Sequence, residues 1–149
     1  MAMRSPGLKL VSLALVVMLS ACAVPGPTSR SAEPPLTSTA LVGGEWIAFA
    51  IHGAPEVQFP KPKLRWIAPD QITGTGGCNG FKGRSSANLS TLQFGPLAST
   101  GRACLSMPGS QEDLYFKALE LTRRARVEHD QLILMDDAGK QLARFLRSN

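Results

Sequence analysis

Residues 45–51 read EWIAFAI and are followed by His52-Gly53. This run is rich in aromatic and β-branched residues, and a turn-forming pair closes it, so we expect a strand here. Residues 63–68, KLRWIA, alternate polar and apolar side chains before Pro69-Asp70. Such alternation is typical of a strand with one buried face. The two runs predict neighbouring strands of a sheet.

Shorter β-prone runs continue the pattern on the C-terminal side. Two of them stop at glycine-containing turns, and three more are separated by short polar turns of the kind found in hairpins. We expect short strands at residues 71–75, 91–94, 126–128, 132–135 and 141–146.

One helix stands out, near residues 110–124. Ser110 can cap the first amides, Glu112 and Asp113 lie at the positive end of the helix dipole, and arginines lie near the other end. The spacing predicts one apolar face. Its expected members are Leu114, Ala118 and Leu121, with Tyr115 and Leu119 beside them.

These elements predict a mainly β fold, a β-rich α+β domain. A curved antiparallel sheet or a partly closed small barrel buries such strands best when the helix covers its open side. Residues 40–149 are enough for one small domain and too few for two.

The first residues of the chain indicate its compartment. Arg4 and Lys9 precede an apolar stretch, and residues 19–22 read LSAC. This order is that of a secretory signal, residues 1–21, ending in a lipobox, so we expect Cys22 to become the acylated first residue. The apolar stretch is shorter than the roughly 20 residues of a spanning helix. We therefore expect a lipoprotein anchored in the membrane by its N-terminal lipid.

Residues 22–39 are rich in Pro, Ser, Thr and Ala and predict a flexible tether. Ala23 follows the acylated cysteine where retention at the inner membrane commonly uses aspartate, which favours the outer membrane, on its periplasmic side. The formal net charge is +5, and it falls to +3 once Arg4 and Lys9 leave with the signal. So small an excess does not indicate a nucleic-acid partner.

Cys78 and Cys104 remain as an even pair in an oxidising compartment, and we expect a disulfide between them. In the chain-entropy model this bridge stabilises the domain by about 3 to 4 kcal/mol. The alternative is a thiol-redox pair. That alternative lacks Cys-x-x-Cys spacing and a local base, so the structural bridge is favoured.

Several motifs together resemble the META-domain family, which includes the HslJ-like heat-shock lipoproteins. They are a Leu-x-Gly pattern leading to Trp46, Gly74-x-x-Gly77-Cys78-Asn79, Thr100-x-x-x-Cys104, and Leu132-x-Leu134 followed by Asp137-x-Gly139. The resemblance covers nearly all of residues 40–149. It implies an envelope protein with a small barrel-like fold, linked to stress response, and it implies no catalytic chemistry.

Other residues point to structure rather than chemistry. His52 and His129 fall in turns without metal-ligand spacing, and Trp46 and Trp66 suit a core. We expect no metal, no cofactor and a monomer. If a binding face exists, we place it at Asn79 and Arg102, beside the disulfide.

Three functions remain. The first is a non-catalytic envelope protein acting in stress response or envelope integrity. The second is a module that binds a small apolar ligand in the barrel or inhibits an enzyme through a loop near residues 102–109. The third is a thiol-redox protein using Cys78 and Cys104. We expect the first.

Overall fold

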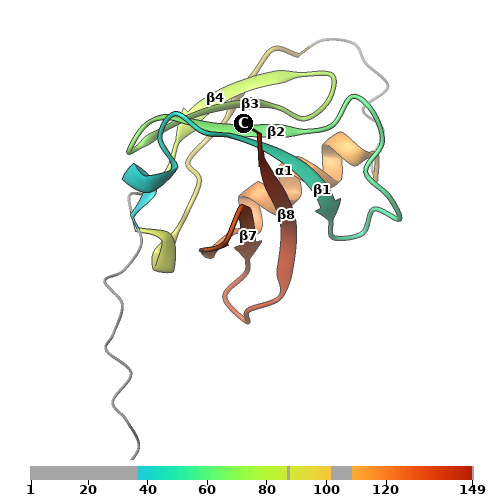
Figure 1. The fold of residues 1–149 in the computed structure, drawn as a ribbon. Helices are drawn as coiled ribbons and strands as arrows, with labels where there is room; N and C mark the ends of the chain where they lie inside the picture. The colour runs from blue at the N-terminus through green and yellow to red at the C-terminus, as the bar shows by residue number, and fades with distance from the viewer. Residues whose placement is uncertain (1–36, 87, 102–108, 149) are drawn as a thin grey trace, which may run out of the picture. The chain divides into compact units, whose positions relative to one another are not determined.

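A computed structural model of the chain describes residues 37–86, 88–101 and 109–148 (Figure 1). Its elements, in chain order, are η1 (Ser38–Leu41), β1 (Glu45–Ile51), β2 (Lys63–Ala68), β3 (Gln71–Thr75), β4 (Gly80–Arg84), η2 (Leu89–Thr91), β5 (Ala98–Ser99), α1 (Gln111–Leu121), β6 (Arg124–Glu128), β7 (Gln131–Met135) and β8 (Gln141–Ser148).

The strands form one eight-stranded antiparallel sheet in the order β5-β4-β3-β2-β1-β8-β7-β6. The N-terminal meander and the C-terminal meander join where β1 pairs with β8. The sheet curves around α1, which packs against β1, β7 and β8, and it brings η2 against β6 (Figure 1). The predicted fold class is confirmed: the sheet is curved and not closed.

Three predicted strands have the observed bounds, those at residues 45–51, 63–68 and 71–75. The strand expected at residues 91–94 is wrong. Asn88 caps a 3-10 turn there by accepting a hydrogen bond from the Ser90 N–H, and the chain then makes only an isolated bridge between Ser85 and Phe94. A local side-chain acceptor has outcompeted strand pairing.

β4 and β5 were not predicted, because β4 reads GFKGR and lacks β-branched residues. Its hydrogen-bonded pairing with β3 holds it in the sheet although its composition has a low β propensity. A Cβ on Gly74 would overlap the Lys63 carbonyl oxygen and the Phe81 ring, so only glycine lets β2, β3 and this ring come so close. Close packing here overrides weak local propensity.

The helix is shorter than the predicted residues 110–124. It starts as expected, because the Ser110 Oγ accepts from the Asp113 N–H at 3.3 Å. It ends at Leu121, where Thr122 turns extended and its hydroxyl donates to the Ala118 carbonyl at 2.7 Å. Tyr115, Ala118 and Leu119 are buried, as predicted, whereas Leu121 is 43% exposed, so placing Leu121 on the apolar face was wrong.

Large side chains fill the space between the sheet and the helix. They include Trp46, Trp66, Tyr115 and Phe145, each at most 1% exposed. The Trp66 Nε1 donates to the Ser85 Oγ at 2.9 Å, and Tyr115 and Phe145 meet edge to face with ring centroids 6.2 Å apart. Both tryptophans are core residues, as predicted. The space between the concave face of the sheet and α1 is therefore filled by side chains.

Within the described ranges, α1 is too short and too polar to cross a bilayer, and no helix found there could do so.

Candidate functional site at the Gly-Cys-Asn turn

The turn between β3 and β4 carries the most distinctive motif of the chain, Gly76-Gly77-Cys78-Asn79. The Gly76 N–H donates to the Asn79 carbonyl at 2.9 Å, and the Gly77 N–H donates to the Thr75 Oγ1 at 3.1 Å. Gly77 has a φ of +122°, which a residue with a Cβ rarely adopts. The turn is thus held in part by hydrogen bonds among its own residues.

Asn79 and Glu112 join this turn to the first turn of α1. The Glu112 Oε1 accepts from the Asn79 N–H at 2.6 Å, and its Oε2 accepts from the Asn79 Nδ2 at 2.9 Å. The Asn79 Oδ1 accepts from the Thr100 hydroxyl at 3.1 Å. Asn79 is 6% exposed and Glu112 is 7% exposed. A buried carboxylate in this position is stabilised by charged hydrogen bonds and by the helix dipole.

Gly76 makes this approach feasible. A Cβ on Gly76 would lie 2.6 Å from the Glu112 Cγ and 2.7 Å from its Oε1, which is closer than such atoms pack. The glycine is therefore needed so that the carboxylate can reach the turn. The glycine at position 76 thus determines how closely the first turn of α1 can approach the β3–β4 turn.

Gln111 makes a second junction at the same end of α1. Its Oε1 accepts from the Gln58 N–H at 2.6 Å, and its Nε2 donates to the carbonyls of Gln58 and Pro60 at 3.1 and 3.3 Å. The loop between β1 and β2 is thereby attached to the helix. Two adjacent helical residues hold two different loops.

Tyr115 continues the polar contacts into the core. Its hydroxyl donates to the Lys63 carbonyl at 3.0 Å. Burial raises the pKa of this phenol well above its ordinary value of 10.0, because the interior disfavours a phenolate. Tyr115 is therefore a neutral core donor at physiological pH.

A pocket of about 610 Å³ lies beside the Asn79–Glu112 contact. Its walls are partly apolar and partly acidic. They include Phe94, Pro96, Leu97, Phe116, Asp113 and Glu120. This hollow is formed by the chain before β5 and by α1, and not by the interior of the sheet, where the second of the three candidate functions would place a ligand. A cavity of this size fits a small molecule.

The described residues include only part of the predicted site. Asn79 is buried at the pocket wall, whereas Arg102 and the expected inhibitory loop lie outside the described residues. Cys78 is partly buried in the turn, and Cys104 and Cys22 also lie outside them. The Cys78–Cys104 bridge and the acylation of Cys22 stay predictions.

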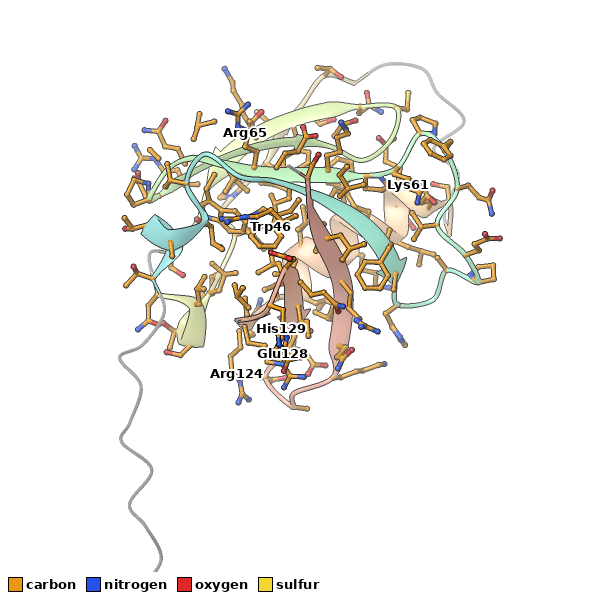
Figure 2. The ribbon with its side chains drawn as sticks, viewed as in Figure 1. Trp46, Lys61, Arg65, Arg124, Glu128 and His129 are labelled. Atoms are coloured by element: carbon orange, nitrogen blue, oxygen red, sulfur yellow. The ribbon has the colours of Figure 1, made fainter. Side chains whose placement is uncertain are left out.

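Both histidines considered as metal ligands lie among the described residues. His52 and His129 are exposed at turns, and His129 adopts a φ of 54°. Figure 2 shows His129 at the tip of the β6–β7 hairpin beside Glu128. Across the described ranges, no group of three or more His, Cys, Asp or Glu residues could hold a metal ion.

Glu112 is the residue of the candidate site whose role sequence reasoning missed. We expected it to serve only as an acid at the helix N terminus, and we expected Asn79 only as part of a possible binding face. The clue was Gly76-Gly77 before the asparagine, which signals that another group comes close. Which group it is depends on tertiary packing, and the sequence does not show it.

The comparisons with known proteins agree with this architecture. A family model described as META domain matches residues 39–149. The fold is similar to an NMR structure of a protein from Burkholderia xenovorans, with 25% identity, a TM-score of 0.56, and coverage of 85% of this chain and 99% of that chain. A second NMR structure has 21% identity and a TM-score of 0.58, covering 74% and 95%. No curated protein matches.

Proposed function

This chain belongs to the META domain family, and from that premise we propose that it is a non-catalytic, lipid-anchored protein of the bacterial envelope. It acts as a monomer, by contact with other envelope components, and supports envelope integrity under stress. Its place is the periplasmic side of the outer membrane.

The order of segments along the chain carries this proposal. A secretory signal with LSAC at residues 19–22 comes first, a Pro- and Ser-rich segment follows, and the match to the family model begins at residue 39. A lipid on Cys22 would hold such a domain at the membrane surface. Ala23 after the acylated cysteine supports export to the outer membrane.

The hydrogen bonds of Glu112 support a role in contact rather than catalysis. A general acid or base must be free to exchange a proton with substrate. Glu112 is instead held by the Asn79 amide N–H and the Asn79 side chain, both on the β3–β4 turn. These bonds fix the turn to the helix, which is a structural task.

Fractionation and complementation test the proposal together. In a deletion strain, the wild-type chain should appear in the outer-membrane fraction and restore growth under heat and detergent stress. Cys22→Ser should be exported but recovered in the soluble fraction, with weaker rescue. A soluble wild-type chain, or full rescue by Cys22→Ser, would count against anchoring as part of the function.

The pocket beside Asn79 favours a second candidate function, the binding of a small apolar ligand. Its apolar wall and its acidic residues Asp113 and Glu120 suit an apolar amine. Titrating the labelled domain with a set of such amines and following amide NMR shifts tests this. Binding predicts shifts confined to residues 94–99 and 112–120, and no shifts there would remove this candidate.

A further inference from the structure

The outer face of the sheet, opposite α1, presents an apolar groove. It has a volume of about 510 Å³ and lies along β1 and β8 below the loop that precedes β2. Ile47 pairs with Leu146 across these strands, so their side chains share the outer face, and Phe49 lines the same groove. Leu146 is 46% exposed.

Phe59 borders this groove from the loop between β1 and β2. It is 86% exposed, which is unusual for a large aromatic side chain. The Lys61 Nζ lies 5.3 Å from the centre of its ring. An exposed apolar ring beside a lysine is a combination also found in segments that lie at a membrane–water interface.

Cations surround the groove on the outer face. Arg65 pairs with Thr73 and Thr73 with Lys82, so both cations point outward in one row across β2, β3 and β4. On β8, Arg144 lies over the Phe49 ring at 4.8 Å and donates to the Gln131 Oε1 at 2.7 Å, so this cation is held against the sheet. Figure 2 shows Lys61 in the loop before β2 and Arg65 on β2, whereas Trp46 points into the interior.

Glu45, which lies opposite Arg65 in the β1–β2 register, neutralises part of this positive charge. Lys63 pairs with Glu45 at 2.9 Å. Among the residues that the structure describes, no carboxylate lies within ion-pair distance of Lys61, Arg65, Lys82 or Arg144. The opposite side of the domain is different, because the exposed side of α1 carries Asp113 and Glu120 against a single Lys117. The domain is therefore polarised, with a cationic apolar side and a more acidic helix side.

From this polarity we propose that the groove face, defined by Phe59, Lys61, Arg65 and Leu146, is a docking surface for an anionic phospholipid bilayer. Phe59 and Leu146 enter the interfacial layer, and the cations contact lipid phosphates. A flat array of headgroups matches a row of cations that spans several strands better than one small anion does.

If the chain is anchored by its lipid, as proposed above, a weak affinity of this surface is enough to keep the domain on the bilayer. To that extent this inference rests on the proposed function. The segment from Cys22 to Thr37 can extend at most about 50 Å. A domain tethered so closely meets the bilayer at a high effective concentration, so modest contacts hold it flat on the surface. Docking in this orientation leaves α1 and the pocket facing the periplasm.

Vesicle binding by the unacylated chain tests the surface without the anchor. The mature chain with Cys22→Ser is mixed with vesicles of phosphatidylethanolamine and phosphatidylglycerol, and with phosphatidylcholine vesicles as the neutral reference. We expect binding to the anionic vesicles alone, weakening as salt is added. Failure here would leave acylation of Cys22 untouched, and failure of acylation would leave this result untouched.

Matched variants locate the surface. Lys61→Ala should weaken the partition coefficient about fivefold, and Phe59→Ser should weaken it about tenfold. Lys117→Ala and Leu121→Ser, a cation and an exposed apolar residue on α1, should leave it unchanged. Unchanged melting temperatures show that each variant folds.

Three results would overturn the proposal. One is no affinity for the anionic vesicles. Another is equal loss in the groove variants and in the α1 variants. The third is binding of a monomeric single-chain anion such as dodecyl phosphate without vesicle binding, which would make the groove a site for one ligand molecule.

Discussion

Glu112 connects two segments that are distant in sequence through one buried carboxylate. Its two oxygens accept from the Asn79 N–H and the Asn79 Nδ2, and Gly76 leaves the space for it. Removing one partner of a buried charged hydrogen bond leaves the other without compensation. At the residue scale, this pair should therefore be sensitive to substitution.

Glu112→Ala should therefore lower the free energy of unfolding by about 2 to 4 kcal/mol, because the buried Asn79 amide loses its acceptor. Urea denaturation measures the change. Glu120→Ala, an exposed acid on the same helix, is the control and should stay within about 0.5 kcal/mol of wild type. Equal effects of the two substitutions would show that the Asn79 contact contributes little.

Tyr115 makes stability depend on alkaline pH. Its folded-state pKa is raised above 10.0, so the unfolded phenol loses its proton first as the pH rises. The tyrosine contribution is complete below about pH 10 and declines above it, by up to about 1.4 kcal/mol per pH unit. We expect the stability difference between wild type and Tyr115→Phe to shrink as the pH rises above about 10. Chemical denaturation at several pH values checks this, and a constant difference would contradict it.

At the scale of elements, strand positions were more predictable than strand partners. Residues 45–51 are rich in β-prone side chains and end at a turn, residues 63–68 alternate polar and apolar side chains, and both strands have the predicted bounds. β4 was missed because its pairing with β3 depends on the close approach at Gly74. The end of α1 was missed because Thr122 bonds back to Ala118. These contacts depend on tertiary packing or on a single side chain, so the periodicity of the sequence does not predict them.

Gly74→Ala tests the packing of β2 on β3. The new Cβ would overlap the Lys63 carbonyl and the Phe81 ring, so strand pairing must shift, and we expect a loss of at least about 2 kcal/mol. Gly80→Ala, on the paired strand, meets nothing closer than 3.7 Å and should change stability by less than about 1 kcal/mol. Thermal and urea unfolding compare them, and similar losses would argue against a special role for Gly74.

At the scale of the whole molecule, the family, the compartment and the candidate site were predicted to different depths. Spaced motifs around Cys78 and Asn79 indicated the META domain, and the family model over residues 39–149 confirms it. The pocket between α1 and the chain before β5 was not foreseen, because its walls come from segments that meet only in the fold. The lipid anchor and the disulfide stay predictions.

The predicted bridge between Cys78 and Cys104 should stabilise the whole domain. Reduction, or the paired change to serine, should lower the free energy of unfolding by about 3 to 4 kcal/mol, because the unfolded chain regains the freedom of a closed loop. A redox titration followed by melting temperature measures it, and a structural bridge predicts a midpotential below about −300 mV. A midpotential near −200 mV with little loss of stability would favour thiol chemistry instead.

The intact mass of the protein purified from membranes tests the central claim most directly. We predict a chain that begins at Cys22 and carries a diacylglyceryl group on the thiol and one acyl chain on its amino group. Cys22→Ser should lack this added mass. An unmodified wild-type chain, or one cut after another residue, would contradict the account of a lipid-anchored envelope protein.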